Sequence, residues 1–229
     1  MQIAIVLFPK ITVLDAIGPY QVLNHLPGAE VVFVAEQAGP VRDETGDLGL
    51  VADAALAEVT RPDVVLVPGG PGSDALVGDS ASAQAAGDWL RAVDQTTTWT
   101  TSVCTGSLVL AAAGLLTGRR ATSHWLALEQ LAQLGAVAAS ERVVFDGKYV
   151  TAAGVSAGID MALTLAGRLA GDEVAQATQL MLEYDPQPPY TAGSPRTAPP
   201  AIVARMRAGS RFPQPASPPA GPPVTSSAR

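Results

Sequence analysis

The sequence predicts one α/β domain over residues 1–185, a three-layer sandwich in which helices cover both faces of a mostly parallel sheet. Apolar runs of strand length alternate with helical patterns throughout this region, as in chains that build parallel sheets. Hydrophobic residues make up 48% of the 229 residues, which is ample for a sizeable core. The length itself fits a single domain of this class.

The first half of the chain contains three expected strands and one long helix. Residues 2–8 are continuously apolar, which is typical of a parallel strand covered on both faces. A helix is expected over 12–26, where a Pro-Gly pair follows and ends it. Residues 29–35 and 63–67 are the second and third strands, and the polar, Gly-containing stretch 38–55 between them predicts a hairpin.

The second half continues the alternation and adds an antiparallel hairpin. The Asp-Gly pair at 146–147 is a strong turn signal between two short apolar segments. Ser156 is expected to cap the helix that follows. The expected elements are helices at 80–93, 105–116, 126–134, 156–169 and 171–184, and strands at 99–103, 143–145 and 149–152.

The chain is organised around residues 98–116, where a short β-prone segment runs into an almost wholly apolar helix. Cys104, the only cysteine, lies at the junction. Such a turn holds a side chain at the carboxyl edge of the sheet, where open α/β folds place their ligands, and a helix N-terminus favours a thiolate. The pattern predicts a nucleophile elbow with sulfur in place of serine oxygen. Inert packing in the core is the alternative for a single cysteine.

Two other segments are expected at the same edge of the sheet. Asp15 follows the first strand in an apolar setting, where burial would raise its pKa and suit it to proton transfer near neutral pH. A simple complement to the helix dipole is the alternative role. The loop PGGPG at 68–72 follows the third strand, and N–H groups at Gly70 and Gly72 can stabilise developing negative charge there, although such a loop also serves as an ordinary turn.

The counts of cysteine and histidine limit the other kinds of site. A single cysteine excludes an internal disulfide, and with only two histidines it makes no convincing zinc site, so no metal is expected. His124 is the natural candidate for a Cys–His pair, but nothing near it in sequence positions it as a base, and a structural histidine is the alternative.

Charge and hydropathy bear on partners and location. The net charge of −7 argues against nucleic-acid and anionic-membrane partners. The N-terminus lacks a basic n-region, and no apolar run reaches the ~20 residues that span a bilayer. We therefore expect a cytoplasmic protein.

The composition changes after Tyr184. Residues 186–229 contain twelve of the 19 prolines, five arginines and no acidic residue. We expect 186–211 to form a C-terminal extension that packs on the domain or on a partner subunit, with a helical turn or two at 201–208. The Pro- and Ser-rich residues 212–229 are expected to be disordered.

Several of these motifs together resemble the ThiJ/PfpI superfamily, which has a flavodoxin-like, class I glutamine-amidotransferase-like fold. They are the acid after the first strand, PGGPG, SVCTG and AGLLTGRRATSHW. The resemblance covers about residues 1–208. Within the superfamily the isonitrile hydratase branch is the most similar, in the segments DAIGPYQVL (15–23), SVCTGSLVLAAAGLL (102–116), TAAGVSAGIDMALTLA (151–166) and EYDPQPPY (183–190).

The resemblance implies hydration of an isonitrile, R–N≡C, to an N-substituted formamide, without a metal or organic cofactor. It implies catalytic roles for Cys104, Asp15 and Thr105. Cys104 would form a thioimidate-like adduct, and Asp15 would act as general acid and then general base while water hydrates it. The protease-like members have His where Thr105 stands, which weakens a peptidase or amidotransferase reading.

The resemblance and the residues themselves suggest substrate contacts and an assembly. N–H groups near Gly70, Gly72 and Thr105 would orient the intermediates. The apolar stretch around Ile17 and Trp125 suggests room for a hydrophobic substituent. A homodimer is expected, in which the Arg-bearing residues 196–207 are candidates to reach an acidic partner surface.

Three other functions remain open at this point. AraC-type regulators contain a similar ligand-sensing domain, but they need a further DNA-binding domain, and this chain has a Pro/Ser-rich tail and an acidic body instead. Another cofactor-free hydrolase or glyoxalase-like enzyme would use the same Cys104. A redox sensor would oxidise it reversibly.

Overall fold

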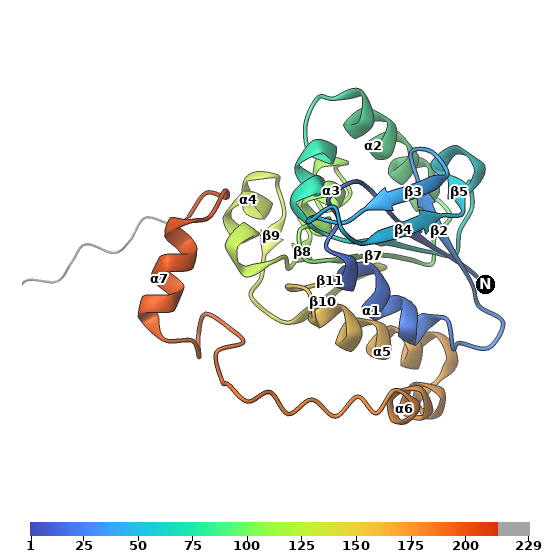
Figure 1. Ribbon diagram of the computed structural model, residues 1–229. Helices are drawn as coiled ribbons and strands as arrows, with labels where there is room; N and C mark the ends of the chain where they lie inside the picture. Colours follow the sequence, from blue (N-terminus) through green and yellow to red (C-terminus); the bar gives the residue numbers. More distant parts are fainter. Residues whose placement is uncertain (215–229) are drawn as a thin grey trace, which may run out of the picture.

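The computed structural model describes residues 1–214, and a seven-stranded sheet lies at its centre (Figure 1). The strands are β1 (Gln2–Val6), β2 (Glu30–Ala35), β5 (Ala54–Ala55), β6 (Val64–Val67), β7 (Trp99–Val103), β10 (Val143–Asp146) and β11 (Tyr149–Ala152). Their order across the sheet is β10-β11-β7-β6-β1-β2-β5. All neighbours are parallel except β10 and β11, which form the expected antiparallel hairpin.

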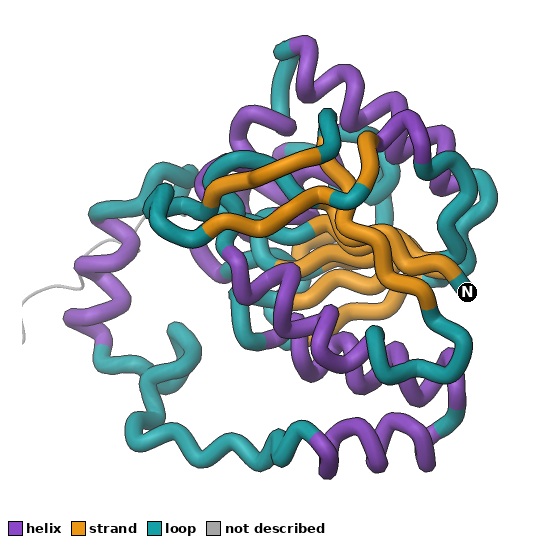
Figure 2. Tube along the Cα trace, turned by 45° about the vertical axis from the view of Figure 1, so that its right-hand side comes forward, coloured by secondary structure: helices purple, strands orange, loops and turns teal. Residues whose placement is uncertain are grey.

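Helices cover both faces of this sheet, so the predicted three-layer α/β sandwich is confirmed (Figure 2). On one face, α1 (Val13–Leu23) packs against α5 (Ala157–Ala170), and α6 (Asp172–Met181) packs against the outside of α5. The other face is covered by α2 (Ala81–Asp94) and α3 (Gly106–Ala112), with α4 (Leu128–Gln133) beside α3. Two small sheets lie outside the main one, β3 (Gly39–Arg42) with β4 (Gly49–Ala52), and β8 (Arg120–Ala121) with β9 (Val137–Ala138).

The sequence explains why these elements form where they do. All four residues of β6, VVLV, are buried, as expected for a central parallel strand covered on both faces. In α2 the buried residues recur with helical spacing, and the hydroxyl of Ser80 accepts a hydrogen bond from the N–H of Ala83 at the first turn.

Two local expectations were wrong. The helix expected over 105–116 ends at Ala112, because Gly114 adopts a left-handed conformation (φ 81°) and the N–H of Leu115 bonds back to the carbonyl of Leu110. This is a Schellman termination, which a continuous apolar run does not reveal. Ser156 makes no side-chain cap to α5; its hydroxyl instead accepts a hydrogen bond from Arg142.

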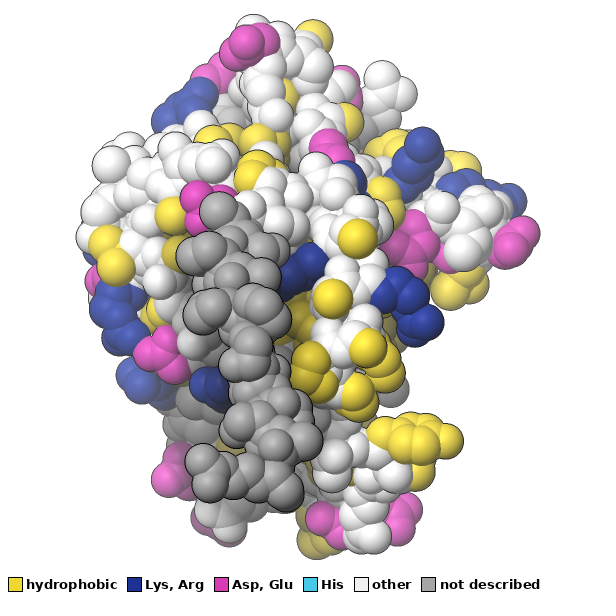
Figure 3. All heavy atoms as spheres, turned by 90° about the vertical axis from the view of Figure 1, so that its left-hand side faces the viewer, with side chains coloured by type: hydrophobic (Ala, Val, Ile, Leu, Met, Phe, Trp, Pro, Cys, Tyr) yellow, Lys and Arg dark blue, Asp and Glu magenta, His cyan; other side chains and the backbone are white. Residues whose placement is uncertain are grey.

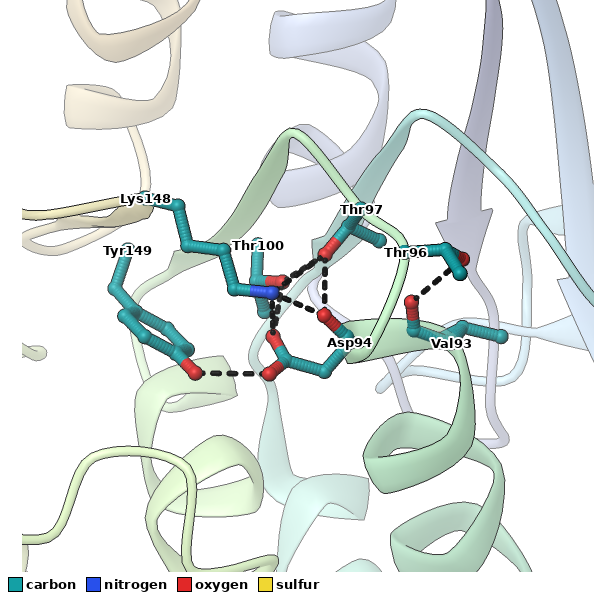
Figure 4. Close-up of polar contacts among 7 residues, drawn as sticks. All are labelled: Val93, Asp94, Thr96, Thr97, Thr100, Lys148 and Tyr149. Carbon is teal, nitrogen blue, oxygen red and sulfur yellow. Dashed lines mark hydrogen bonds and ion pairs between the residues drawn. The ribbon is translucent and has the colours of Figure 1, made fainter.

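A polar cluster lies at the amino-terminal edge of β7 and β11, at the opposite ends of these strands from Cys104 (Figure 4). Asp94, only 13% exposed, accepts hydrogen bonds from Thr100 (2.6 Å) and from the Tyr149 hydroxyl (2.8 Å), and it forms an ion pair with Lys148 (3.2 Å). Burial first, and then the Asp94 carboxylate, raises the pKa of Tyr149 to about 12. The cluster joins the end of α2 to two strands and has no part in the cavity at Cys104.

We expect Asp94→Ala to lower the free energy of unfolding by about 2–3 kcal/mol, because it leaves a partly buried ammonium and two hydroxyls without their shared acceptor. Urea unfolding measures this change. Asp88→Ala, on the same helix, removes an exposed partner of Arg91 and is the matched control, with an expected change within about 0.5 kcal/mol. Equal effects of the two substitutions would contradict a structural role for the cluster.

The C-terminal extension leaves the body of the fold after α6. Residues 182–199 run as a long irregular segment to α7 (Pro200–Ala208), which has no buried residue. Residues 209–214 then return to the domain beside α4. The segment expected to be disordered, 212–229, falls outside the described residues from position 215 onward.

Candidate active site

Cys104 lies at the turn between β7 and α3, with a left-handed backbone (φ 57°) that is uncommon for any residue with a side chain. The turn is held from several sides. A Cβ at Gly106 would stand 1.9 Å from the carbonyl oxygen of Val67, so only glycine allows α3 to approach the end of β6. The hydroxyls of Ser107 and Ser123 donate to the carbonyl of Cys104 at 3.2 and 3.0 Å. The expected elbow is thus present in the backbone.

Asp15 reaches the same point from the first turn of α1 and is completely buried. Its Oδ2 accepts a hydrogen bond from the N–H of Gly69 (2.9 Å), whereas Oδ1 has no hydrogen-bond partner of ordinary geometry among residues 1–214. Burial raises the pKa of Asp15 to about 7, against the opposing effects of the Gly69 N–H and the Cys104 side chain. The carboxyl therefore gains and loses a proton near neutral pH, as the sequence predicted.

The Cys104 thiol is 5% exposed and strongly disfavours ionisation. Burial, followed by the nearby negative charge of Asp15, raises its pKa to about 12, although the N–H groups of Val155 and Thr105 act in the opposite direction. The expectation that the helix N-terminus favours a resting thiolate was therefore wrong, because desolvation outweighs it. At neutral pH the site holds a neutral thiol next to a carboxyl group that can accept its proton.

Thr105 ties the elbow to the glycine loop. Its Oγ1 accepts hydrogen bonds from the N–H of Gly70 (3.0 Å) and from the hydroxyl of Ser73 (2.9 Å), and it is buried beside Cys104. A Cβ at Gly69 would lie 2.5 Å from the Thr105 nitrogen and 2.9 Å from Asp15 Oδ2. The loop therefore comes this close to Thr105 and Asp15 only because Gly69 has no side chain. Gly69 and Ser73 are site residues that the sequence analysis did not single out.

The three expected substrate contacts have different positions. Gly70 lines the cavity at Cys104, but its N–H is already bonded to Thr105. Gly72 is buried, donates its N–H to the Lys10 carbonyl and is not among the residues that line the cavity. Ile17 is half-buried on α1 and is likewise not part of that lining.

The cavity has a volume of about 410 Å³ and opens directly onto the thiol. Its walls come from the loop after β1, the glycine loop, the segment before α4 and the C-terminal extension. The residues around it are Thr12, Glu44, Gly70, Pro71, Cys104, Thr105, His124, Leu126, Val155 and the run 209–212. Glu44 and 209–212 were not predicted as site residues, because each is brought to the cavity by long-range packing.

His124 lines the same cavity without forming a pair with Cys104. Its Nδ1 accepts the N–H of Leu126 (3.4 Å). Burial first, and then the charge of Arg211, lowers the pKa of His124, so the ring is neutral at physiological pH. Within 1–214, no three His, Cys, Asp or Glu side chains are grouped as a metal site would require. The described helices also include none with the length and apolar character needed to cross a bilayer.

Comparison with known proteins gives matches over most of the chain. Residues 1–168 match the model of the DJ-1/PfpI family. Isonitrile hydratase of Pseudomonas putida is 47% identical over 210 residues, which cover 91% of this chain and 90% of that protein. The HTH-type transcriptional regulator CdhR of Pseudomonas aeruginosa is 34% identical over 167 residues, which cover 70% of this chain and 47% of the regulator.

A solved structure agrees with this assignment. A ThiJ/PfpI family protein from Pseudomonas syringae superposes with a TM-score of 0.85 at 38% identity, covering 90% of this chain and 84% of that one. The family match over residues 1–168 includes the elbow, the glycine loop and α1. The chain belongs to the DJ-1/PfpI family.

Proposed function

We propose that this protein hydrates an isonitrile to an N-substituted formamide, through a covalent intermediate on Cys104 with Asp15 as the proton carrier. One observation carries the proposal. A neutral thiol and a carboxyl group with a pKa of about 7 are buried together at the end of a small cavity. The similarity to the Pseudomonas putida isonitrile hydratase supports the choice of reaction.

The first step adds the thiol to the terminal carbon of the isonitrile. A bond forms between the Cys104 sulfur and that carbon while the thiol proton passes to the Asp15 carboxylate. Asp15 then delivers this proton to the same carbon, whose lone pair accepts it, and the product is the thioimidate R–N=CH–S–Cys. Because the proton leaves as the bond forms, the reaction does not need a resting thiolate, which the raised pKa of Cys104 disfavours.

The second step consumes one water molecule. Its oxygen bonds to the thioimidate carbon, and Asp15 accepts a proton from it and passes that proton to the nitrogen, which gives R–NH–CH(OH)–S–Cys. The carbon–sulfur bond then breaks as the hydroxyl becomes a carbonyl, and the hydroxyl proton returns to sulfur. The products are the formamide and the free thiol, so the enzyme is unchanged and no redox chemistry occurs.

The groups around the pair fit this sequence of steps. The N–H groups of Thr105 and Val155 act on the sulfur and stabilise negative charge as the carbon–sulfur bond forms and breaks. Thr105 positions the glycine loop through its hydroxyl, so we assign it a positioning role. We propose that the reaction needs no metal or organic cofactor. We also propose that the protein is a homodimer, which sedimentation of the full-length protein tests.

The other candidate functions are less well supported. Redox-sensing cysteines are exposed and ionise readily, whereas Cys104 is buried with a pKa near 12. A ligand-sensing role like that of a transcriptional regulator would use the same cavity, but it gives no reason to bury a carboxyl group that titrates at neutral pH. Both roles predict no turnover of an isonitrile.

Formamide production from cyclohexyl isocyanide tests the proposed function. We expect turnover by the wild type and a fall in kcat of at least about 10⁴-fold in Cys104→Ala, because the nucleophile is lost while the small side chain keeps the turn folded. Circular dichroism checks the fold of the variant. Absence of turnover in the wild type would overturn the hydratase function, and turnover that survives the substitution would overturn the covalent mechanism.

A further inference from the structure

The segment after α7 forms one wall of the cavity at Cys104. We call residues 209–214 the C-terminal strap. The helix before it has no buried residue, yet Gly209, Ser210, Arg211 and Phe212 all line the cavity. Among residues 186–214 only Phe212 is buried, and it lies where the chain passes the nucleophile.

Three polar contacts hold the strap on both sides of the cavity. The Arg211 guanidinium forms an ion pair with Asp74 (Nε to Oδ2, 2.9 Å) and donates to the carbonyl of Gly70 (3.4 Å). On the other side, the side-chain amide of Gln214 donates to the carbonyl of Leu126 (3.0 Å). The first two contacts lie on the glycine loop and the short helix after it, and the third lies before α4, so the strap bridges two of the cavity walls.

Phe212 is the apolar part of this wall. Its side chain is only 9% exposed, and the guanidinium of Arg211 lies over its ring, 4.3 Å from the centroid, which limits the ring's orientation. Leu126 and Val155 line the cavity from other elements. The space next to the thiol is thus bounded by three apolar side chains from distant parts of the sequence.

The surface around the strap carries both apolar and basic side chains. Figure 3 shows the face that carries the extension, where hydrophobic side chains and groups of Lys and Arg lie side by side. The strap's one arginine is turned toward Asp74, so its charge is neutralised at the cavity mouth.

We propose that the C-terminal strap determines substrate specificity, with Phe212 contacting the substituent R of the isonitrile and selecting compact apolar groups. This inference rests on the proposed function for the identity of the substrate, but the covering of Cys104 by the strap does not. Burying an apolar substituent against an aromatic ring contributes binding in proportion to the area removed from water. A substituent too small to reach the ring gains nothing from it.

The first test compares two isonitriles. In Phe212→Ala we expect kcat/KM for cyclohexyl isocyanide to fall about tenfold or more, while that for methyl isocyanide changes less than about twofold. Phe212→Leu, which restores most of the apolar volume, should recover much of the loss. Equal losses for both substrates would overturn the proposal, because a merely structural role of Phe212 affects them alike.

The second test does not depend on hydratase activity. Cys104 is the chain's only cysteine, so its alkylation reports on this site alone. Asp74→Asn removes the ion pair of the strap and should speed alkylation by iodoacetamide two- to fivefold, roughly the population change that a half-exposed ion pair produces. Asp79→Asn makes the same charge change at an exposed residue outside the cavity lining and should leave the rate unchanged.

The same assay tests the shape of the wall. Phe212→Ala should lower the rate of alkylation by N-cyclohexyl iodoacetamide relative to that by iodoacetamide, at least about threefold, because the larger reagent loses its apolar contact with the ring. If neither substitution changes these rates, the strap does not cover Cys104 and the inference is wrong. If they change as expected but the wild type hydrates no isonitrile, the proposed reaction fails and the strap remains the selective wall for another electrophile.

Discussion

Asp15→Asn is expected to lower kcat/KM for isonitrile hydration by about 10²–10⁴-fold and, at pH 8, to make the protein more stable. The amide keeps the shape and accepts the hydrogen bond from Gly69, but it cannot carry a proton between sulfur, carbon and water. It also removes a buried carboxylate, one oxygen of which has no hydrogen-bond partner of ordinary geometry within residues 1–214. A lower kcat/KM together with a higher free energy of unfolding is the result expected for a residue that is retained for catalysis and not for stability.

The sign of the stability change follows from the pKa of Asp15. The folded pKa is about 7 against an ordinary value of 3.8 for an aspartate, so between these values the folded state binds more protons than the unfolded state. The free energy of unfolding therefore decreases as pH rises through this window, by roughly 4 kcal/mol in all, and the full cost is present above pH 7. Urea unfolding at pH 5 and pH 8 measures more than half of this decrease, about 3 kcal/mol. Wild type and Asp15→Asn should differ in this slope, and identical slopes would contradict the raised pKa.

The same pKa sets the pH dependence of the wild-type reaction. Because Asp15 must accept the thiol proton, kcat/KM should fall about tenfold per pH unit below about 7 and stay level above it. If the rate instead fell above pH 7, Asp15 would act first as an acid, and the order of proton transfers proposed here would be wrong.

Gly106→Ala is expected to lower the free energy of unfolding by at least about 3 kcal/mol, or to prevent folding, because the added Cβ would lie 1.9 Å from the carbonyl oxygen of Val67 and 2.7 Å from that of Pro68. Both obstacles are backbone atoms at the end of β6, so no side-chain rotation relieves the clash. The yield of soluble protein and its urea midpoint measure the effect.

Gly78→Ala is the matched control for this substitution. A Cβ at Gly78 would have no atom within 4 Å, and its stability should change by less than about 0.5 kcal/mol. If Gly106→Ala were tolerated as well as Gly78→Ala, the close approach of α3 to the end of β6 would not be required for folding.

Much of the fold was predictable because its cause is local. The continuous apolar run of β6 and the Asp-Gly turn between β10 and β11 each specify their element within a few residues. The positions of Asp15 and Cys104 at one edge also followed from the sequence, because successive parallel strands place their carboxyl ends together.

The unpredicted features arise from the balance of forces in the folded state. Cys104 was expected to ionise readily, but the helix N-terminus is a small effect compared with burial beside Asp15. The early end of α3 depends on the conformation of Gly114, which an apolar run does not specify. Phe212 lies more than a hundred residues from Cys104 in a Pro-rich segment, where composition favours disorder. Its position depends on tertiary contacts, such as those of Arg211 with Asp74 and of Gln214 with Leu126, which composition does not reveal.

The left-handed backbone of Cys104 has a consequence for how this protein would evolve. A side chain at φ 57° costs about 1–3 kcal/mol, which glycine would largely avoid, and the buried Asp15 adds a cost of its own at neutral pH. In a lineage released from selection for the reaction, substitutions at these two positions are stabilising and should accumulate early. Descendants that keep the sheet but have Gly at 104 or a neutral residue at 15 would be recognisable as former enzymes, and they should melt at higher temperature than their active relatives.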